Sequence, residues 1–302
     1  MKKWSLLATA LCLPVLAFGQ GREDLSTTGE PPMLGIHWAR GHDAHGHGGG
    51  GRSPLMTLHG GNIMTTAVTK NIFWGPSWSN FTFTADKITG LETWYMDFNG
   101  SNYAKTSDEY NGLNGLFVGP NTTHQGNVVD TSASAGGGST SAILAEVCTK
   151  ITPDPSGNGY YSVYSDLPRG NAGYCAYHSA GTCSGKPVQF AFFWNLDGDA
   201  GCDPQDTSGL HSQGLAALAN VSGHELSEAR TDPGFGGVFG GWQDSSGQEN
   251  GDKCAWTFNV PLVTFAGSKS QWKIQGEWSN AAFTANTGYP NSSGQHGCID
   301  GH

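Results

Sequence analysis

Residues 207–233 read TSGLHSQGLAALANVSGHELSEARTDP and show the strongest helical pattern in the chain. Apolar side chains recur there at helical spacing and form one continuous stripe: Leu210, Leu215, Leu218, Val221 and Leu226. Each of the three residues 206–208 can cap the amino end, and the Asp-Pro pair at 232–233 ends the pattern. The segment therefore predicts a long helix over 207–230 that packs one face against a core.

The rest of the chain mixes strand and helix patterns. Runs rich in β-branched and aromatic residues predict strands at 67–74, 159–165, 188–196, 260–265 and 271–278. Helical spacing of apolar residues predicts two more helices, at 84–98 with Thr84 as its cap and at 139–151. A chain of 302 residues is long enough for one large domain. We therefore expect an α+β (or α/β) fold in a single domain, with a central mixed sheet and one long helix.

The first 54 residues differ in composition from the rest of the chain. Residues 1–19 combine a basic start, an apolar run and a small-residue cleavage site, which predicts a secretory signal peptide. Residues 20–54 are rich in histidine and glycine, and this composition predicts a flexible linker or a pro-segment. The globular domain is then expected over 55–302, in a protein secreted to the extracellular space.

The cysteine content agrees with export. Of seven cysteines, Cys12 lies in the predicted signal peptide, which leaves six in the mature chain. An even number of cysteines in an exported protein predicts a disulfide framework. Cys175–Cys183 is the favoured pair because it closes a short loop, and Cys202–Cys254 is a second candidate.

The end of the predicted helix carries the sequence HELSE at 224–228. His224 and Glu228 are four residues apart, so a helix places them on one face, one turn from each other. Imidazole nitrogen and carboxylate oxygen are both zinc donors, and Glu225 between them could take a proton from a water molecule on the metal. This arrangement is that of the H-E-x-x-H motif, with glutamate in place of the second histidine. The motif predicts a zinc site with Glu225 as the catalytic base.

A third zinc ligand is expected from the segment that follows the helix. Residues 241–256 read GWQDSSGQENGDKCAW and supply Asp244, Glu249 and Asp252. Glu249 and Asp252 are the favoured candidates, with Asp252 slightly ahead. Three protein ligands would leave one position on the metal open for water, as catalysis requires.

Other polar residues suggest weaker alternatives. Asp197, Asp199 and Asp203 lie in a glycine-rich turn that could bind calcium, although their spacing is not that of an EF-hand loop. His178 and His211 are each interpreted as structural histidines rather than metal ligands.

The overall charge, the hydropathy and the aromatic residues limit the kinds of binding partner that we expect. The net charge is −10, and the sequence contains no basic stripe, which argues against nucleic acid as a partner. Beyond the signal peptide, no stretch is long and apolar enough to suggest a membrane span. The many tryptophans could line a carbohydrate-binding surface, but most of them are expected to be buried or half-buried in the core.

Several motifs resemble those of known secreted proteins. The segments SGHELSEARTDP, GWQD with GQENGDKCAW, and GEWSN resemble a group of secreted bacterial proteins with a metallopeptidase-like helix. The segments YCAYHSAGTCSGKPVQFAFFW, GCDP and HGGNIMTTAVTKNIFWGPSW are similar to the plant EXORDIUM and phosphate-induced protein 1 family. Together these matches span most of residues 58–280. The resemblance implies secretion and a shared architecture, and it assigns no reaction because the plant family is tied to extracellular growth responses.

The sequence therefore predicts a secreted zinc-dependent hydrolase that is zincin-like in outline. Its expected substrate is protein or peptide, with His224 and Glu228 as metal ligands, Asp252 or Glu249 as the third, and Glu225 as the base. The alternative is a non-catalytic extracellular module of the EXORDIUM type, which would bind a cell surface or carbohydrate. In that alternative the His224 and Glu228 side chains have only a structural role.

Overall fold

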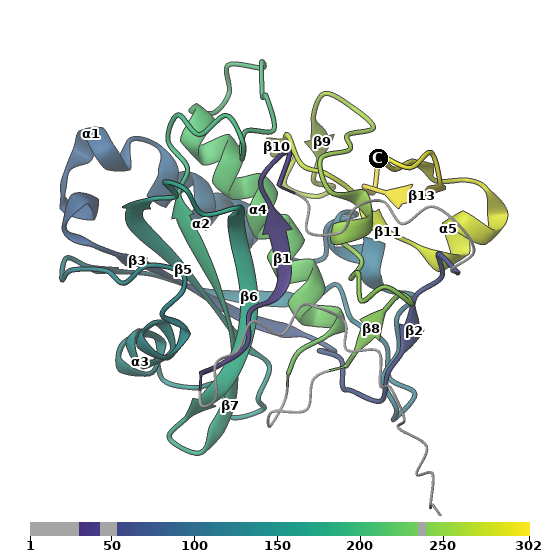
Figure 1. Ribbon diagram of the computed structural model, residues 1–302, viewed down its shortest axis with the longest axis horizontal. Helices are drawn as coiled ribbons and strands as arrows, with labels where there is room; N and C mark the ends of the chain where they lie inside the picture. Colours follow the sequence, from purple (N-terminus) through teal and green to yellow (C-terminus); the bar gives the residue numbers. More distant parts are fainter. Residues whose placement is uncertain (1–29, 43–52, 235–239) are drawn as a thin grey trace, which may run out of the picture.

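A computed structural model describes residues 30–42, 53–234 and 240–302 of the chain. A six-stranded mixed sheet lies at the centre of the molecule (Figure 1). Across the sheet, the strands follow the order β1 (Leu34–Trp38), β6 (Tyr174–Cys183), β7 (Lys186–Asn195), β5 (Gly159–Pro168), β3 (Ala67–Trp74) and β4 (Thr122–Asp130). The strands from β7 to β4 are parallel, whereas β6 pairs antiparallel with β7, and β1 pairs antiparallel with β6. The expected α+β fold with a central mixed sheet is confirmed.

Helices cover both faces of this sheet. Helices α2 (Lys87–Phe98) and α4 (Gln213–Thr231) pack on one face, and α3 (Thr140–Lys150) packs on the other. Alternate residues of each strand point to opposite faces, so Tyr160 joins the core under α4 while its neighbour Tyr161 joins the core under α3. The two faces of the sheet thus carry separate hydrophobic cores.

Helix α4 is enclosed on all sides. Its residues 214–231 are all buried, because the sheet covers one side and carboxyl-terminal segments cover the other. The remaining elements are short: α1 (Phe81–Thr84), α5 (Asn280–Ala285), β2 (Thr57–Leu58), β8 (Trp242–Gln243), β9 (Val263–Thr264), β10 (Gln271–Trp272), β11 (Glu277–Trp278), β12 (Tyr289–Pro290) and β13 (His296–Ile299). Polar side chains on α4 are therefore removed from bulk water in this conformation.

Helix α4 begins later than the sequence pattern predicts. Its cap is Ser212, whose hydroxyl accepts a hydrogen bond from the Leu215 backbone N–H, rather than any of residues 206–208. The Asp206 carboxylate instead accepts the backbone N–H of Ser208 and closes a local turn. Leu210 consequently lies outside the helix and is 57% exposed, so it does not belong to the apolar stripe.

Three disulfides link the chain, and both predicted pairs are wrong. The bonds are Cys148–Cys183, Cys175–Cys202 and Cys254–Cys298. Cys175 and Cys183 stand at the two ends of a single strand, β6, which at ~3.3 Å per residue separates them by about 26 Å. A disulfide needs Cα atoms within about 7 Å, so this pair cannot form.

The amino-terminal segment departs from the predicted linker in part. Residues 34–38 form β1 at the edge of the central sheet, and His37 and Ala39 are fully buried. Composition predicts a flexible segment because it takes no account of contacts with other parts of the chain. Here the edge of β6 offers unpaired backbone groups, and residues 34–38 pair with them. Residues 1–29 and 43–52 lie outside the described residues. The predicted signal peptide and the rest of the predicted linker fall within these two ranges. Within the described part of the chain, no helix has the length and apolar character needed to cross a membrane.

Candidate metal centre

The HELSE motif lies near the carboxyl end of α4, and the helix brings its polar residues together. His224 Nε2 is 3.1 Å from Glu228 Oε2. Donor atoms of His224, Glu225 and Glu228 all lie within 4.8 Å of one another. The three residues have no exposed surface. The predicted convergence of imidazole and carboxylate on one helix face is therefore present, but in the interior of the molecule.

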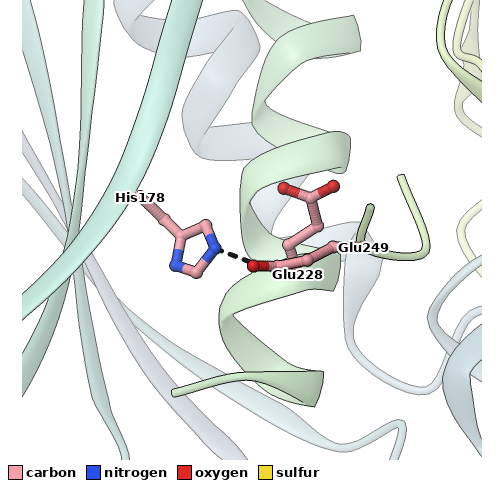
Figure 2. A group of neighbouring side chains, drawn as sticks. All are labelled: His178, Glu228 and Glu249. Carbon is pink, nitrogen blue, oxygen red and sulfur yellow. Dashed lines mark hydrogen bonds and ion pairs between the residues drawn. The ribbon is translucent and has the colours of Figure 1, made fainter. Parts of the chain in front are cut away.

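A second group of donors shares the same carboxylate. His178 on β6 and Glu249 in the loop after α4 have donor atoms within 4.8 Å of each other and of Glu228. His178 Nε2 lies 3.2 Å from Glu249 Oε2, the hydrogen bond drawn in Figure 2. His178 therefore lies within the candidate site, where it is hydrogen-bonded to Glu249. The signal for it was the alternation of β6, which turns Ala176 and His178 toward α4.

Asp252 lies at the edge of this cluster. Its carboxylate Oδ1 is 3.8 Å from His224 Nε2, and its Oδ2 accepts the backbone N–H of Glu249. The backbone N–H of Asp252 in turn donates to Glu228 Oε1 at 2.9 Å. Asp252 belongs to neither of the two donor groups, so of the two predicted third ligands Glu249 is the better placed. The remaining acid of this segment, Asp244, pairs with Lys253 at 2.7 Å.

The loop after α4 reaches the cluster because it carries a glycine. A Cβ atom at Gly251 would lie 2.7 Å from His224 Nδ1 and 2.9 Å from Glu228 Oε1. Distances this short are not tolerated between non-bonded atoms, so only glycine lets the backbone pack directly on the two side chains. This close approach brings Glu249 and Asp252, which flank Gly251, beside the helix.

Gln275 is a member of the site that the sequence analysis did not identify. Its side-chain N–H groups donate to His224 Nδ1 at 3.1 Å and to the Gly251 carbonyl at 2.9 Å. Its Oε1 accepts the backbone N–H of Trp256 and lies 3.0 Å from His37 Nε2. A neutral imidazole that accepts at Nδ1 carries its proton on Nε2. In this arrangement, His224 therefore presents an N–H group toward Glu228.

Burial dominates the electrostatics of the site. It lowers the pKa of His224 and of His178 to about 3, so both rings are neutral at physiological pH. Burial also raises the pKa of Glu225 well above its ordinary value, and the nearby charges of Glu228 and Asp252 act in the same direction. Neutral imidazole is the form that binds metals. The cluster thus combines uncharged nitrogen donors with closely spaced acids.

The predicted calcium turn is arranged differently. Asp197 forms an ion pair with Lys87, and Asp199 forms one with Arg169 at 2.6 Å. Asp203 Oδ1 accepts the backbone N–H of Gln205. None of these acids belongs to a group of convergent metal donors in the described residues. Two of the three predicted calcium ligands are instead neutralised by basic side chains.

Two other predicted groups lie apart from the cluster. His211 stacks on Trp272 with ring centroids 4.4 Å apart and pairs with Asp206, so its surroundings are structural. Every tryptophan that the structure describes is buried or half-buried. The described tryptophans therefore form no exposed aromatic platform of the kind that the carbohydrate-binding alternative suggested.

Comparison with protein-family models, curated proteins and solved structures finds no match to this chain. The resemblance to the EXORDIUM family consequently stays an expectation. Any proposal about function must come from the geometry and chemistry of the buried cluster.

Proposed function

We propose that this chain is a secreted zinc-dependent hydrolase that cleaves peptide bonds. The observation that carries the proposal is the convergence of two buried donor groups on one carboxylate, Glu228. Export is supported by the signal-peptide pattern and by the three disulfides, which persist in oxidising compartments.

The charge balance of the cluster favours a bound cation. The imidazoles of His178 and His224 face Glu249 and Glu228, but their lowered pKa values leave them without charge. Glu225 lies in the same buried volume as Glu228. Buried carboxylates this close are costly unless protons or a cation offset their charge. A divalent ion would offset it and would use the donor atoms already gathered there.

The donor set fits zinc. We assign His224, Glu228 and Glu249 as the ligands. His224 and Glu249 belong to different donor groups that share Glu228, so a bound ion must draw these two side chains closer together. His178 is then the hydrogen-bond partner that orients Glu249, since ligating carboxylates are themselves usually hydrogen-bonded. Three ligands leave the open position that catalysis needs. The Gln275 amide must also adjust. It has to turn over so that its oxygen accepts a hydrogen bond from the Nδ1–H group of His224, which leaves Nε2 free for the metal. This change gives up the present hydrogen bonds of the amide with the Gly251 carbonyl and the Trp256 N–H.

Glu225 is then the catalytic base. A zinc ion, when bound, polarises a carbonyl group and makes water more acidic. Glu225 takes a proton from the water molecule that attacks the peptide carbonyl, and it returns that proton to the amine that leaves as the C–N bond breaks.

The ligand assignment can be tested with two matched substitutions. We expect Glu249→Gln to weaken zinc binding more than about 100-fold, and His178→Gln to weaken it only about 10- to 100-fold, as is typical of outer hydrogen-bond partners. Competition with a chelating zinc indicator measures both affinities. The reverse order would make His178 the ligand and Glu249 the orienting group.

The hydrolase itself is tested by zinc-dependent cleavage of casein, a substrate without stable structure. Because the site is buried, the assay runs for hours in urea below the global unfolding transition, where edge strands open locally. We expect slow cleavage that a chelator abolishes and added zinc restores. Intact casein after incubation with the zinc-loaded chain, under conditions where hydrogen exchange shows that β1 opens, would contradict the proposal.

A non-catalytic metalloprotein is the second candidate, and one observation favours it. His178 lies in one donor group with Glu228 and Glu249, so it can itself bind the ion. If His224 from the other group joined these three residues, zinc would have four protein donors and no open position. Such a site, fully buried as this one is, would stabilise an extracellular module instead of catalysing a reaction. The two candidates differ in the order of the Glu249→Gln and His178→Gln effects and in the casein assay.

A further inference from the structure

Strand β1 covers the buried cluster. It is the edge strand of the central sheet, pairing with β6 through Leu34 and His178 and through His37 and Ala176. It also packs against α4, and Figure 1 shows it crossing in front of that helix. This one short strand, from a segment far from the motif in sequence, therefore lies across the HELSE motif.

The backbone of β1 touches the donor atoms directly at Gly35. The φ angle of this residue is +46°, and a Cβ atom there would lie 2.0 Å from Glu228 Oε2 and 2.6 Å from His178 Nε2. No residue with a side chain fits this position. The register of the β1–β6 pair is irregular between Leu34 and His37, which allows the backbone to approach the cluster here.

His37 fixes the other end of the contact. Its ring lies 4.2 Å from the His224 ring and 4.5 Å from the Trp256 ring, measured between centroids. Its Nε2 is 3.0 Å from Gln275 Oε1, on the amide that also donates to His224 Nδ1. While β1 is in place, it helps to hold Gln275 in the orientation that keeps a proton on His224 Nε2. The strand thus covers the ligands and also contacts the amide group that determines which nitrogen of His224 carries the proton.

We propose that β1 occupies the place of the substrate, and that the substrate is an extended polypeptide paired antiparallel with β6. This inference rests on the proposed hydrolase function. Without β1, the edge of β6 beside His178 would offer unpaired backbone groups, which bind extended chains. The residue over the ligands would have to be glycine, as Gly35 is, because nothing larger fits between Glu228 and His178. The chain is then latent until its own amino-terminal strand leaves.

The test compares two glycines of the same segment in the full-length chain. Gly35→Val places a side chain against the donors, whereas Gly41→Val is a control at a similar positive φ of +78° with nothing within 4 Å. We expect Gly35→Val to release zinc to a chelator at least about tenfold faster than wild type, because opening of β1 is favoured. Hydrogen exchange of the β6 amides should speed up in the same variant and not in Gly41→Val. Equal rates in the two variants would overturn the proposal.

A peptide competition tests the substrate class directly. A fluorescent peptide of residues 30–42, EPPMLGIHWARGH, should bind the Gly35→Val chain and not the wild type, whose β6 edge is occupied. The same peptide with valine at the Gly35 position should not bind. Equal binding of both peptides, or no binding of either, would contradict an extended substrate with glycine over the ligands.

A cross-strand lock covers the case in which Gly35→Val does not fold. Trp38 and Tyr174 are directly opposite on β1 and β6, so Trp38→Cys with Tyr174→Cys can form a disulfide. Zinc release should slow when this bond is oxidised and recover on mild reduction, with wild type under the same reductant as the control. Unchanged release would overturn the proposal. If no variant binds zinc, the proposed function fails, while hydrogen exchange and peptide binding still decide the role of β1.

Discussion

Glu228→Gln is expected to abolish zinc binding in practice, with a loss of affinity well above about 100-fold, since even outer hydrogen-bond partners cost about 10- to 100-fold. The substitution keeps the size of the side chain and removes its charge. Glu228 is the only carboxylate that belongs to both convergent groups in the described residues, so no other single change affects both. Metal content after gel filtration and competition with a chelating indicator measure the effect.

The matched control for this substitution is Glu277→Gln. Glu277 is also fully buried, and burial raises the pKa of its carboxyl group well above the ordinary value. It accepts a hydrogen bond from the Tyr103 hydroxyl at 2.7 Å and belongs to neither donor group. Zinc content should therefore be unchanged in Glu277→Gln. Wild-type zinc affinity in Glu228→Gln would remove Glu228 from the site and with it the proposed centre.

Glu225→Gln is expected to lower the rate of casein cleavage by about 100- to 10,000-fold, the usual contribution of a general base. Zinc content should stay at the wild-type level, because Glu225 is not one of the assigned ligands. A glutamine amide cannot accept the proton of the attacking water, although it fills the same space. Rates are measured in the same urea concentration for both chains, so that the opening of the site is common to both.

The combination of the two readouts separates the alternatives. Loss of cleavage with retained zinc assigns Glu225 to the chemical step, whereas loss of both would make it a ligand. Full activity in Glu225→Gln would exclude it as the base. A chain that binds zinc but never cleaves casein, with or without Glu225, would be the non-catalytic metalloprotein.

Local sequence patterns were sufficient to predict the helices and strands whose own residues show helical spacing or alternation. The alternating strand at 67–74 matches β3 in full, and the helix pattern at 139–151 matches α3 within one residue at each end. HELSE was placed correctly on a helix, because four-residue spacing fixes two side chains on one face whatever surrounds them. These features depend on neighbours a few residues away.

Some errors are local: α4 begins after Ser212, and α2 begins at Lys87 with Asp86 and not Thr84 as its cap. The errors that affect the site concern contacts between distant segments. The disulfide partners were wrong because sequence separation does not show that Cys175 and Cys183 stand at opposite ends of one strand. Asp252 was placed slightly ahead of Glu249, whereas Glu249 is the one that belongs to a donor group, because a hydrogen bond from the Asp252 backbone to Glu228 positions the loop. His178 was missed because the strand β6 that carries it was not predicted, and His37 because it reaches the cluster through the β1–β6 pairing, which no local pattern encodes.

By itself, the sequence determined the fold class, the long helix and the identity of three polar residues on it, since these follow from residue type and short-range spacing. The tertiary structure alone decided that those residues are buried, that His178 and Glu249 join them, and that β1 covers them. The physical reason is that burial and coordination depend on which distant backbone segments approach each other closely. Gly35 and Gly251 allow this approach, but a glycine in the sequence does not show which residues it will contact.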